Sequence, residues 1–418
     1  MADVERLSCT CVIAGGGPAG VMAGYLLARA GVDVIVLEKH ADFFRDFRGD
    51  TIHASTTEVM AELGLLDAFL EVPHQEARYA EGMVGDEHIR LADFTHLPTR
   101  CKFVALMPQW DFLNFLVSQA RRYPSFRLIM STEAVDLIKS ESGTVVGVKA
   151  QSGSPAAGES PLRHVEIDAR LVIGADGRHS RLRQAAGLAV HDLGAPIDVL
   201  WFKLAAGDNR EHVILGRIAD GQALIMIDRG TYFQCALVIK KGSAEAVKRQ
   251  GLAAFRVRVA RLAGRGRADE IASLDDVKVL TVVVDRIEAW CRPGLLFIGD
   301  AAHAMSPIGG VGINLAIQDA VAVANLLAAD LRRGEVSLAA LKAVQRRRWF
   351  PTWATQRMQL VIQNNGVDPI LKSAKTPRVP SALRYLARQA WFQRLAGRVV
   401  AIGFRPEHVH TAEWRGTT

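Results

Sequence analysis

The sequence has 418 residues, of which 49% are hydrophobic and 23% are charged. Its composition is therefore that of a globular protein with two or three domains. The net charge of +7 favours anionic ligands or surfaces, but the dense basic block Arg346–Arg348 is too short to predict nucleic-acid binding. The five cysteines are scattered and the histidines lack metal-site spacing, so we predict no disulfide framework and no metal site.

Neither a signal peptide nor a membrane-spanning helix is predicted. The N-terminal residues are polar, and no uninterrupted apolar run reaches about 18 residues. Because the few cysteines also suit a reducing compartment, we expect the protein to be cytoplasmic.

The first forty residues predict a compact β-α-β unit. The apolar run Cys9–Ala14 favours a strand, and Pro18–Ala30 favours a helix that ends at Gly31. Asp33–Glu38 favours a second strand, which is apolar on both faces as a buried parallel strand requires.

Glycines with dinucleotide-binding spacing lie between this strand and this helix. Gly15 permits a tight turn, Gly17 lets the backbone approach a pyrophosphate, and Gly20 lets the helix pack close to the strand. The open N–H groups at the helix start face the phosphates, and the acid that ends the second strand can accept a hydrogen bond from a ribose hydroxyl. The predicted nucleotide contacts are Gly15, Gly17, Pro18, Ala19, Gly20, Glu38 and Lys39.

The middle of the chain alternates between helical and strand patterns. Residues 56–69 and 109–122 favour helices, whereas 128–137, 144–150 and 165–174 favour strands. The last of these strands leads into a second nucleotide-type turn, Gly174-Ala-Asp-Gly177.

A second domain is predicted from residue 191 onward. Residues 197–240 contain short strands separated by Gly, Asp and Asn, which is typical of an antiparallel sheet. A basic helix over 244–264 and a strand over 277–284 follow. An apolar strand, 294–299, then enters the motif Gly299–His303.

The last third of the chain is predicted to be helical. A long helix over 312–332 follows the glycine-rich stretch Pro307–Asn314, and helical patterns continue from 338 to about 401. Residues 369–406 contain eight basic residues and no acid, interleaved with apolar ones. This pattern fits either a helix packed on the body or peripheral contact with an anionic membrane.

Three motifs, Gly15–Gly20, Gly174–Gly177 and Gly299-Asp300, resemble those of the group A flavoprotein monooxygenases, whose type member is para-hydroxybenzoate hydroxylase. The resemblance covers about residues 10–345. It implies an α/β fold with a Rossmann-like FAD-binding domain, an inserted antiparallel-sheet substrate domain and C-terminal helices. We expect the FAD domain over 1–72, 106–190 and 278–345, the substrate domain over 73–105 and 191–277, and a C-terminal helical region over 346–418.

The resemblance also implies site residues. Asp300, which directly follows a predicted strand, would bind the flavin ribityl or ribose hydroxyls, with a helix N-cap as the alternative. Asp176 would serve both FAD and NAD(P)H, with a turn residue as the alternative. The glycine-rich helix start would lie against the flavin and stabilise negative charge on it. The cofactor contacts implied are Arg48, Gln109, Asp176, Gly299, Asp300, Pro307, Gly310, Gly312, Ile313 and Asn314.

Three residues are candidates for catalysis. Pro307 resembles the family proline beside the flavin ring. Asp50 resembles an acid that lies close to flavin and substrate in some members, although a solvated loop acid fits equally well. Arg217 could pair with an anionic substrate, or it could be a surface arginine. Trp201, Met226 and Tyr232 from the same sheet are further candidates for contact with a phenol. We interpret His53 and His303 as polar positions beside the cofactor.

The resemblance implies an enzyme that uses NADH or NADPH and O2. Through a flavin C4a-hydroperoxide it would hydroxylate an aromatic, phenolic or polyketide-like small molecule. An FAD-dependent dehydrogenase or reductase of a lipophilic substrate on the same fold is the alternative, and a non-catalytic binder is disfavoured because the nucleotide motifs are intact. The substrate, the choice of nicotinamide cofactor and the oligomeric state stay open.

Overall fold

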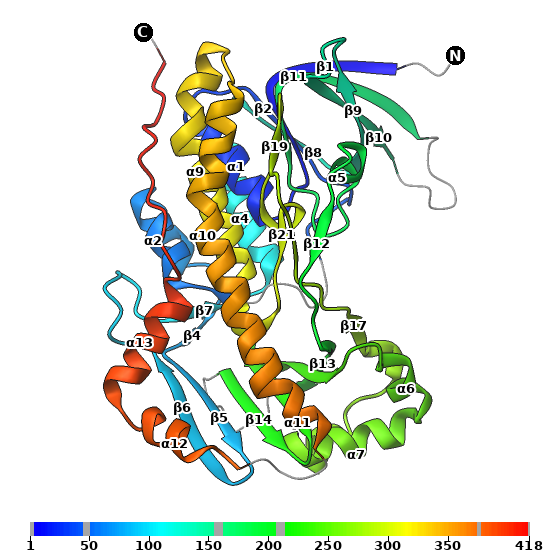
Figure 1. The fold of residues 1–418 in the computed structure, drawn as a ribbon, viewed down its shortest axis with the longest axis vertical. Coiled ribbons are helices and arrows are strands. Elements are labelled where there is room, and N and C mark those ends of the chain that lie inside the picture. Colours follow the sequence, from blue (N-terminus) through cyan, green and yellow to red (C-terminus); the bar gives the residue numbers. More distant parts are fainter. Residues whose placement is uncertain (1–3, 45–50, 154–161, 206–213, 374–377, 417–418) are drawn as a thin grey trace.

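The computed structural model describes residues 4–44, 51–153, 162–205, 214–373 and 378–416. Two large sheets organise this part of the chain, and long helices run beside both (Figure 1).

The first sheet has eight strands, which include a parallel run in the order β20-β11-β1-β2-β8. Three strands join this run in antiparallel pairs. β19 pairs with β20, β10 pairs with β11, and β9 pairs with β10. The four residues of β2 are all buried, as a parallel strand covered on both faces requires. The strands are β1 (Val4–Ala14), β2 (Val34–Leu37), β8 (Phe126–Ile129), β9 (Thr132–Lys139), β10 (Val145–Ser152), β11 (Arg163–Gly174), β19 (Cys291–Arg292) and β20 (Leu295–Phe297).

The second sheet has seven strands in the order β17-β13-β16-β15-β14-β5-β6. Its pairs are antiparallel except for β14 with β5. β17 belongs to this sheet, although it begins one residue beyond the expected substrate-domain segment. The strands are β5 (Tyr79–Val84), β6 (Glu87–Asp93), β13 (Ile197–Ala205), β14 (Ile214–Ala219), β15 (Gln222–Asp228), β16 (Tyr232–Lys240) and β17 (Lys278–Leu280).

Two small three-stranded sheets join the large ones. One has the order β12-β18-β21 and the other β3-β7-β4. Their strands are β3 (Thr51–Ile52), β4 (Gln75–Ala77), β7 (Val104–Leu106), β12 (Val190–Asp192), β18 (Asp285–Ile287) and β21 (His303–Ala304).

The helices divide between the sheets. α1, α4 and α9 pack together beside the first sheet, whereas α6, α7 and α8 lie beside the second (Figure 1). The first group and its neighbours are α1 (Pro18–Arg29), α2 (Ala54–Glu62), α3 (Leu66–Leu70), α4 (Gln109–Ala120), α5 (Arg181–Ala185) and α9 (Gly312–Arg333). The others are α6 (Ala244–Arg249), α7 (Gly251–Ala263), α8 (Arg265–Ala268), α10 (Leu338–Ile362), α11 (Asp368–Lys372), α12 (Ser381–Ala387) and α13 (Ala390–Ala401).

α9 is a core helix. Among the described residues, the helical stretch Ile308–Arg333 is the one that is long and apolar enough to cross a membrane, but 78% of its most apolar window is buried inside the protein. Burial against the first sheet therefore accounts for its hydrophobicity.

α10 is the longest described helix and runs from the first sheet to the second (Figure 1). It continues through a π-turn, η4 (Gln363–Val367), into α11. The chain then covers β6 with α12 and α13, and Arg384 of α12 forms an ion pair with Glu87 at 2.6 Å. These C-terminal helices therefore pack on the body of the protein.

Several predicted elements are broken in the structure. The strand predicted over 128–137 is two strands, because Ser131 has a φ of 51° and turns the chain between β8 and β9. The helix predicted over 56–69 is α2 and α3, separated at Gly64, which has a φ of 69°. The strand predicted over 277–284 contains only β17 before an irregular stretch.

The contact of α13 with β6 yields a stability prediction. A Cβ atom on Gly397 would lie 2.2 Å from the carbonyl oxygen of Asp93, whereas one on the exposed helical Gly266 would meet nothing within 4 Å. We expect Gly397→Ala to lower the free energy of unfolding by about 1–3 kcal/mol through overpacking. Gly266→Ala should raise it by up to about 1 kcal/mol through helix propensity. Urea unfolding of both variants tests this, and equal effects would contradict the described packing.

Candidate active site

The carboxyl ends of three parallel strands meet at one edge of the first sheet. The register aligns Ala14 of β1 with Gly174 of β11, and Gly174 with Phe297 of β20. The three glycine motifs follow directly after these residues, so they converge at the edge where open α/β sheets bind ligands.

Contacts that leave no room for a side chain hold the motifs together. A Cβ atom on Gly15, which has a φ of 109°, would lie 2.3 Å from the carbonyl oxygen of Ala175. A Cβ atom on Gly20 would lie 1.9 Å from the carbonyl oxygen of Gly15. One on Gly299 would lie 3.0 Å from the Cβ of Ala19. Glycine at these positions therefore sets how closely the strands and α1 approach one another.

The start of α1 is open to a ligand. A Cβ atom on its N-cap residue, Gly17, would meet nothing within 4 Å, and neither a side-chain cap nor an acid occupies the first turn. Pro18 occupies the first helical position, followed by Ala19 and Gly20. The free N–H groups in the first turn of α1 and the open space around them fit a pyrophosphate.

Glu38 lies beside this turn. Its carboxylate is buried and accepts hydrogen bonds from the backbone N–H of Gly16 at 3.1 Å and of His40 at 3.0 Å. The neighbouring Lys39 is directed elsewhere, because its ammonium group lies 3.9 Å from the carboxylate of Glu133 on β9. The structure therefore brings Glu38, but not the charge of Lys39, to the glycine turn.

Asp176 and Asp300 have different surroundings. Asp176 accepts a hydrogen bond from the N–H of Leu182 at 3.2 Å, while its other oxygen is buried without a partner among the described residues. Burial raises the pKa of Asp176, an effect that hydrogen bonds from Ser180 and nearby backbone groups only partly offset. The half-buried carboxylate of Asp300 has no hydrogen bond to the described chain, so it can accept one from a bound hydroxyl.

The glycine-rich stretch before α9 forms the far side of this edge. Gly309 and Gly310 have φ values of 80° and 62°, which few other residues adopt. Gly310 also accepts a hydrogen bond from the hydroxyl of Thr51 at 2.9 Å. No described side chain caps α9, and its first turn contains no acid, so the helix start at Gly312 and Ile313 favours negative charge on a ligand.

Asn314 secures the segment from β3 to the first turn of α2. Its side-chain oxygen accepts hydrogen bonds from the N–H of His53 at 2.8 Å and the hydroxyl of Thr56 at 2.7 Å. Its side-chain nitrogen donates to the carbonyl oxygens of Thr51 and Gly310. These contacts occupy the amide, so its place at the edge is that of a positioning residue.

Two predicted residues lie outside the described residues, and two others lie at the starts of helices. Arg48 and Asp50 belong to the part of the chain that the structure does not describe. Pro307 caps the short helix Ile308–Gly310 and is half-buried. Gln109 is the first residue of α4.

The position of Arg217 does not support the predicted substrate contact. In β14 it pairs with Leu224, which belongs to the apolar cluster covered by α7, and paired residues of antiparallel strands share a face. Met226 lies on this face too. Trp201 belongs to the cluster on the opposite face. Tyr232 on β16 lies on that face too, because it pairs with Ala205, which alternates in phase with Trp201 along β13. The structure therefore separates Arg217 and Met226 from the other candidates.

A stripe of glutamines on α10, which our sequence analysis did not identify, supports the loop before α9. Gln356 donates to the carbonyl oxygens of Asp285 and Ala304, and Gln359 donates to those of Ser306 and Ile308. Gln363 in the π-turn donates to the hydroxyl of Ser306. All three side chains are buried. Their spacing of three and four residues places them on one helix face, and that spacing was visible in the sequence.

A buried ionic network lies behind the motif Gly299-Asp300. We did not predict it from the sequence. The carboxylate of Asp319 contacts Nε2 of His303 at 2.6 Å, Nε of Arg348 at 3.0 Å and the N–H of Gly299 at 3.1 Å. Burial opposes ionisation of Asp319, but His303 and Arg348 more than offset it and hold its pKa below the usual value. The network fixes Gly299 to α9 and α10.

Comparisons with known proteins agree with this geometry. A family profile described as "FAD binding domain" matches residues 8–357. The chain is 32% identical over 396 residues to 6-methylpretetramide 4-monooxygenase of Streptomyces rimosus, covering 90% of this chain and 91% of that protein. It is 26% identical over 325 residues to pentachlorophenol 4-monooxygenase of Sphingobium chlorophenolicum, covering 76% of this chain and 57% of that protein.

The fold is also similar to solved structures. OxyS anhydrotetracycline hydroxylase of Streptomyces rimosus superposes with a TM-score of 0.72 at 22% identity, covering 99% of this chain and 78% of that one. The predicted fold, with its FAD-binding sheet and antiparallel substrate sheet, is thereby confirmed.

Asp300 provides a direct test of the cofactor site. We expect Asp300→Asn to weaken FAD binding about tenfold to a hundredfold, because a hydrogen bond to a charged acceptor contributes about 1.5–3 kcal/mol. Asp86→Asn, at an exposed turn, is the matched control. Titration of the apoprotein with FAD, followed by flavin fluorescence, measures both affinities. Equal affinities for the two variants would remove Asp300 from the site.

His53 predicts a pH dependence of stability. Burial lowers its pKa to about 4 from 6.5, although its Nδ1 bonds to the carbonyl oxygen of Val400 at 2.9 Å. Between pH 6.5 and 4 the unfolded chain therefore binds the extra proton, so His53 makes the protein less stable as the pH falls. The loss is on the order of 3 kcal/mol.

His53→Gln removes this titration, so its unfolding free energy should fall less steeply than that of the wild type over the same range. His179→Gln, at an exposed position, serves as the control. Urea unfolding at a series of pH values gives the slopes, and parallel curves for wild type and His53→Gln would contradict the burial argument.

Proposed function

The chain belongs to the FAD-binding family of flavoprotein monooxygenases, and on that premise we propose that it hydroxylates a phenolic, polyketide-like small molecule with NADH or NADPH and O2. The observation that carries the cofactor assignment is the convergence of three glycine motifs at one sheet edge, with the carboxylate of Asp300 open to a ligand. The 32% identity to a monooxygenase named for 6-methylpretetramide favours a polycyclic aromatic substrate.

The residues present fit FAD. When bound, FAD supplies the chemistry that accepts hydride and activates O2. The start of α1, with Gly17, would hold the pyrophosphate, and Glu38 and Asp300 would accept hydrogen bonds from ribose and ribityl hydroxyls. Gln109 and Asp176 are proposed to complete the cofactor site, together with Arg48.

The start of α9 would stabilise negative charge on the reduced cofactor. Gly310, Gly312 and Ile313 lie in the turn that carries its open N–H groups, and Pro307 precedes them. The glutamines of α10 hold the backbone on the other side of this turn. The protein's contribution is therefore to position the reactants and to favour charge at one place.

The substrate is proposed to lie against the face of the second sheet that α7 does not cover. Trp201 and Ile227 are buried on this face, and Ile225 and Tyr232 are half-buried on it. A broad surface of aromatic and aliphatic side chains suits a planar aromatic ring system. Asp50 stays a proposed contact of flavin and substrate.

The domain division follows from the same proposal. Residues 1–72, 106–190 and 278–345 would bind FAD, and 73–105 and 191–277 would bind the substrate. A cytoplasmic location, with peripheral membrane contact through the basic helices within residues 369–406, is likewise a proposal. It has support from the exposed Tyr385, Trp391 and Leu395 beside the arginines of α12 and α13.

Anaerobic stopped-flow absorbance tests the reaction. The FAD-loaded enzyme is reduced with NADH or NADPH in the presence of simple and polycyclic phenols, and is then mixed with 18O2. We expect one phenol class to accelerate flavin reduction and its product to gain one labelled oxygen atom. Reduction that no phenol accelerates, with no labelled product, would contradict a monooxygenase and favour a dehydrogenase or reductase.

Trp201→Phe and Met226→Leu form a matched pair for the substrate face. Both are conservative changes of buried side chains, but Trp201 and Met226 point to opposite faces of the second sheet. The first change should raise the KM for the best phenol, whereas the second should leave it unchanged. Equal effects would mean that the substrate lies elsewhere.

A further inference from the structure

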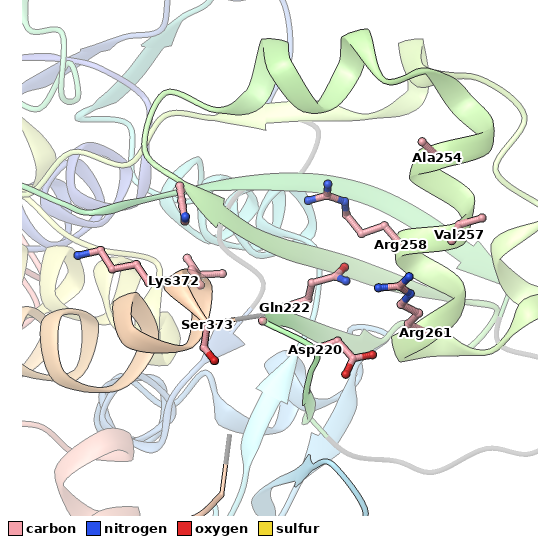
Figure 2. A pocket seen from close by; sticks show the side chains of 11 residues that line it. Asp220, Gln222, Ala254, Val257, Arg258, Arg261, Lys372 and Ser373 are labelled. Carbon is pink, nitrogen blue, oxygen red and sulfur yellow. The ribbon is translucent and has the colours of Figure 1, made fainter. Parts of the chain in front are cut away.

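A basic cavity lies at the end of the second sheet that is remote from the glycine motifs. It has a volume of about 420 Å³ and opens between the β14–β15 turn, α7 and α11 (Figure 2). β15 begins in this cavity at Gln222. Its other end, at Asp228, precedes Arg229. Arg229 lies near Asp111 at the start of α4, because its charge favours the ionised form of that carboxyl group. Seven residues of strand separate the two ends by about 20 Å, so the cavity is distinct from the cofactor edge.

Four cationic side chains from three elements line this cavity. Lys240 ends β16, Arg258 and Arg261 project from α7, and Lys372 comes from α11. Figure 2 shows Arg258 and Arg261 on the α7 side, with Lys372 on the opposite side. The lining also contains one acid, Asp220.

Acidic neighbours do not neutralise most of this charge. Lys372 pairs with Asp368 at 2.6 Å, and the one partner of the Arg258 side chain among the described residues is the amide oxygen of Gln250 at 3.2 Å. Within the described part of the chain, the side chains of Lys240 and Arg261 make no hydrogen bond and no ion pair. Like charges held around one opening repel one another, so a bound anion would stabilise them.

An unpartnered acceptor belongs to the same cavity. Gln222 lines it, and its Oε1 atom is buried without a hydrogen-bond partner among the described residues. Figure 2 shows the Gln222 side chain directed toward Arg258 and Arg261. A ligand that donates a hydrogen bond there would remove the cost of leaving this oxygen unpaired.

Close packing fixes two walls of the cavity relative to one another. Gly221, at the tip of the β14–β15 turn, has a φ of 71°, and a Cβ atom on it would lie 2.0 Å from the carbonyl oxygen of Ser373. The turn therefore touches the end of α11 directly, and Gln222 and Lys372 have a defined separation before any ligand binds.

We propose that this cavity is a binding site for a small molecule that bears phosphate groups and a hydrogen-bond donor. Two guanidinium and two ammonium groups exceed the charge of the two carboxylates, Asp220 in the lining and Asp368 on Lys372, and arginine forks match the oxygens of phosphate. The cavity volume lies in the range of small-molecule sites. The proposal does not depend on the reaction at the flavin.

Isothermal titration of the FAD-loaded enzyme with inorganic phosphate, pyrophosphate and ADP tests this site. We expect one ligand per chain, with affinity that falls as salt is added. Arg258→Gln and Arg261→Gln should each weaken binding at least about tenfold, because each removes a charge-assisted hydrogen bond. Arg265→Gln is the matched control, since Arg265 is exposed on the neighbouring α8 and lies outside the cavity.

The outcomes distinguish a ligand recognised by its phosphates alone from a nucleotide. Equal affinity for pyrophosphate and ADP supports a site that recognises phosphates alone, whereas tighter ADP binding supports a nucleotide. Binding that Arg258→Gln and Arg261→Gln leave unchanged would place the ligand outside this cavity and overturn the proposal. The absence of binding by all three probes would overturn it as well.

Discussion

Close packing at three glycines is the constraint on which the site depends. Side chains at Gly15, Gly20 or Gly299 would overlap Ala175, the Gly15 carbonyl or Ala19. The strand ends can therefore meet only where these positions carry no Cβ atom. The close approach leaves the starts of α1 and α9 open toward one region. A cofactor with a central pyrophosphate and a redox-active ring at one end fits between two such helix starts.

Polar groups, rather than apolar packing, support this arrangement from behind. Three buried glutamines, two on α10 and one in the π-turn after it, hold the chain around Ser306, and Asp319 joins Gly299 to His303 and Arg348. Displacing any of these bonded partners would leave a further buried polar group unpaired, which favours this one geometry. α10 also continues through the π-turn into α11, which contacts the second sheet, so one continuous helical segment connects the two large sheets.

The parts that sequence could predict are those encoded by local patterns. The glycine turn, Glu38 and Asp300 each lie next to a strand that hydrophobicity identifies, so their positions follow from neighbours in the chain. The direction of Arg217 could not be predicted in this way. Side chains alternate between the two faces of β14, but the sequence does not tell which face packs against α7. The folded structure shows that the face of Arg217 does. His53 likewise bonds to Val400, 347 residues away, and the partners of Gln359 lie about 50 residues upstream.

The C-terminal tail returns to the first β-α-β unit. The N–H of Trp414 donates to the carbonyl oxygen of Arg29 at 2.8 Å, and its ring lies against Gly31 and below the guanidinium of Arg332. During vectorial synthesis, the glycine turn therefore leaves the ribosome long before the residues that cover its helix. β20 and α9, which complete the cofactor edge, also emerge late. The nascent N-terminal unit must stay partly uncovered until most of the chain has been made, which exposes it to chaperones and to premature association.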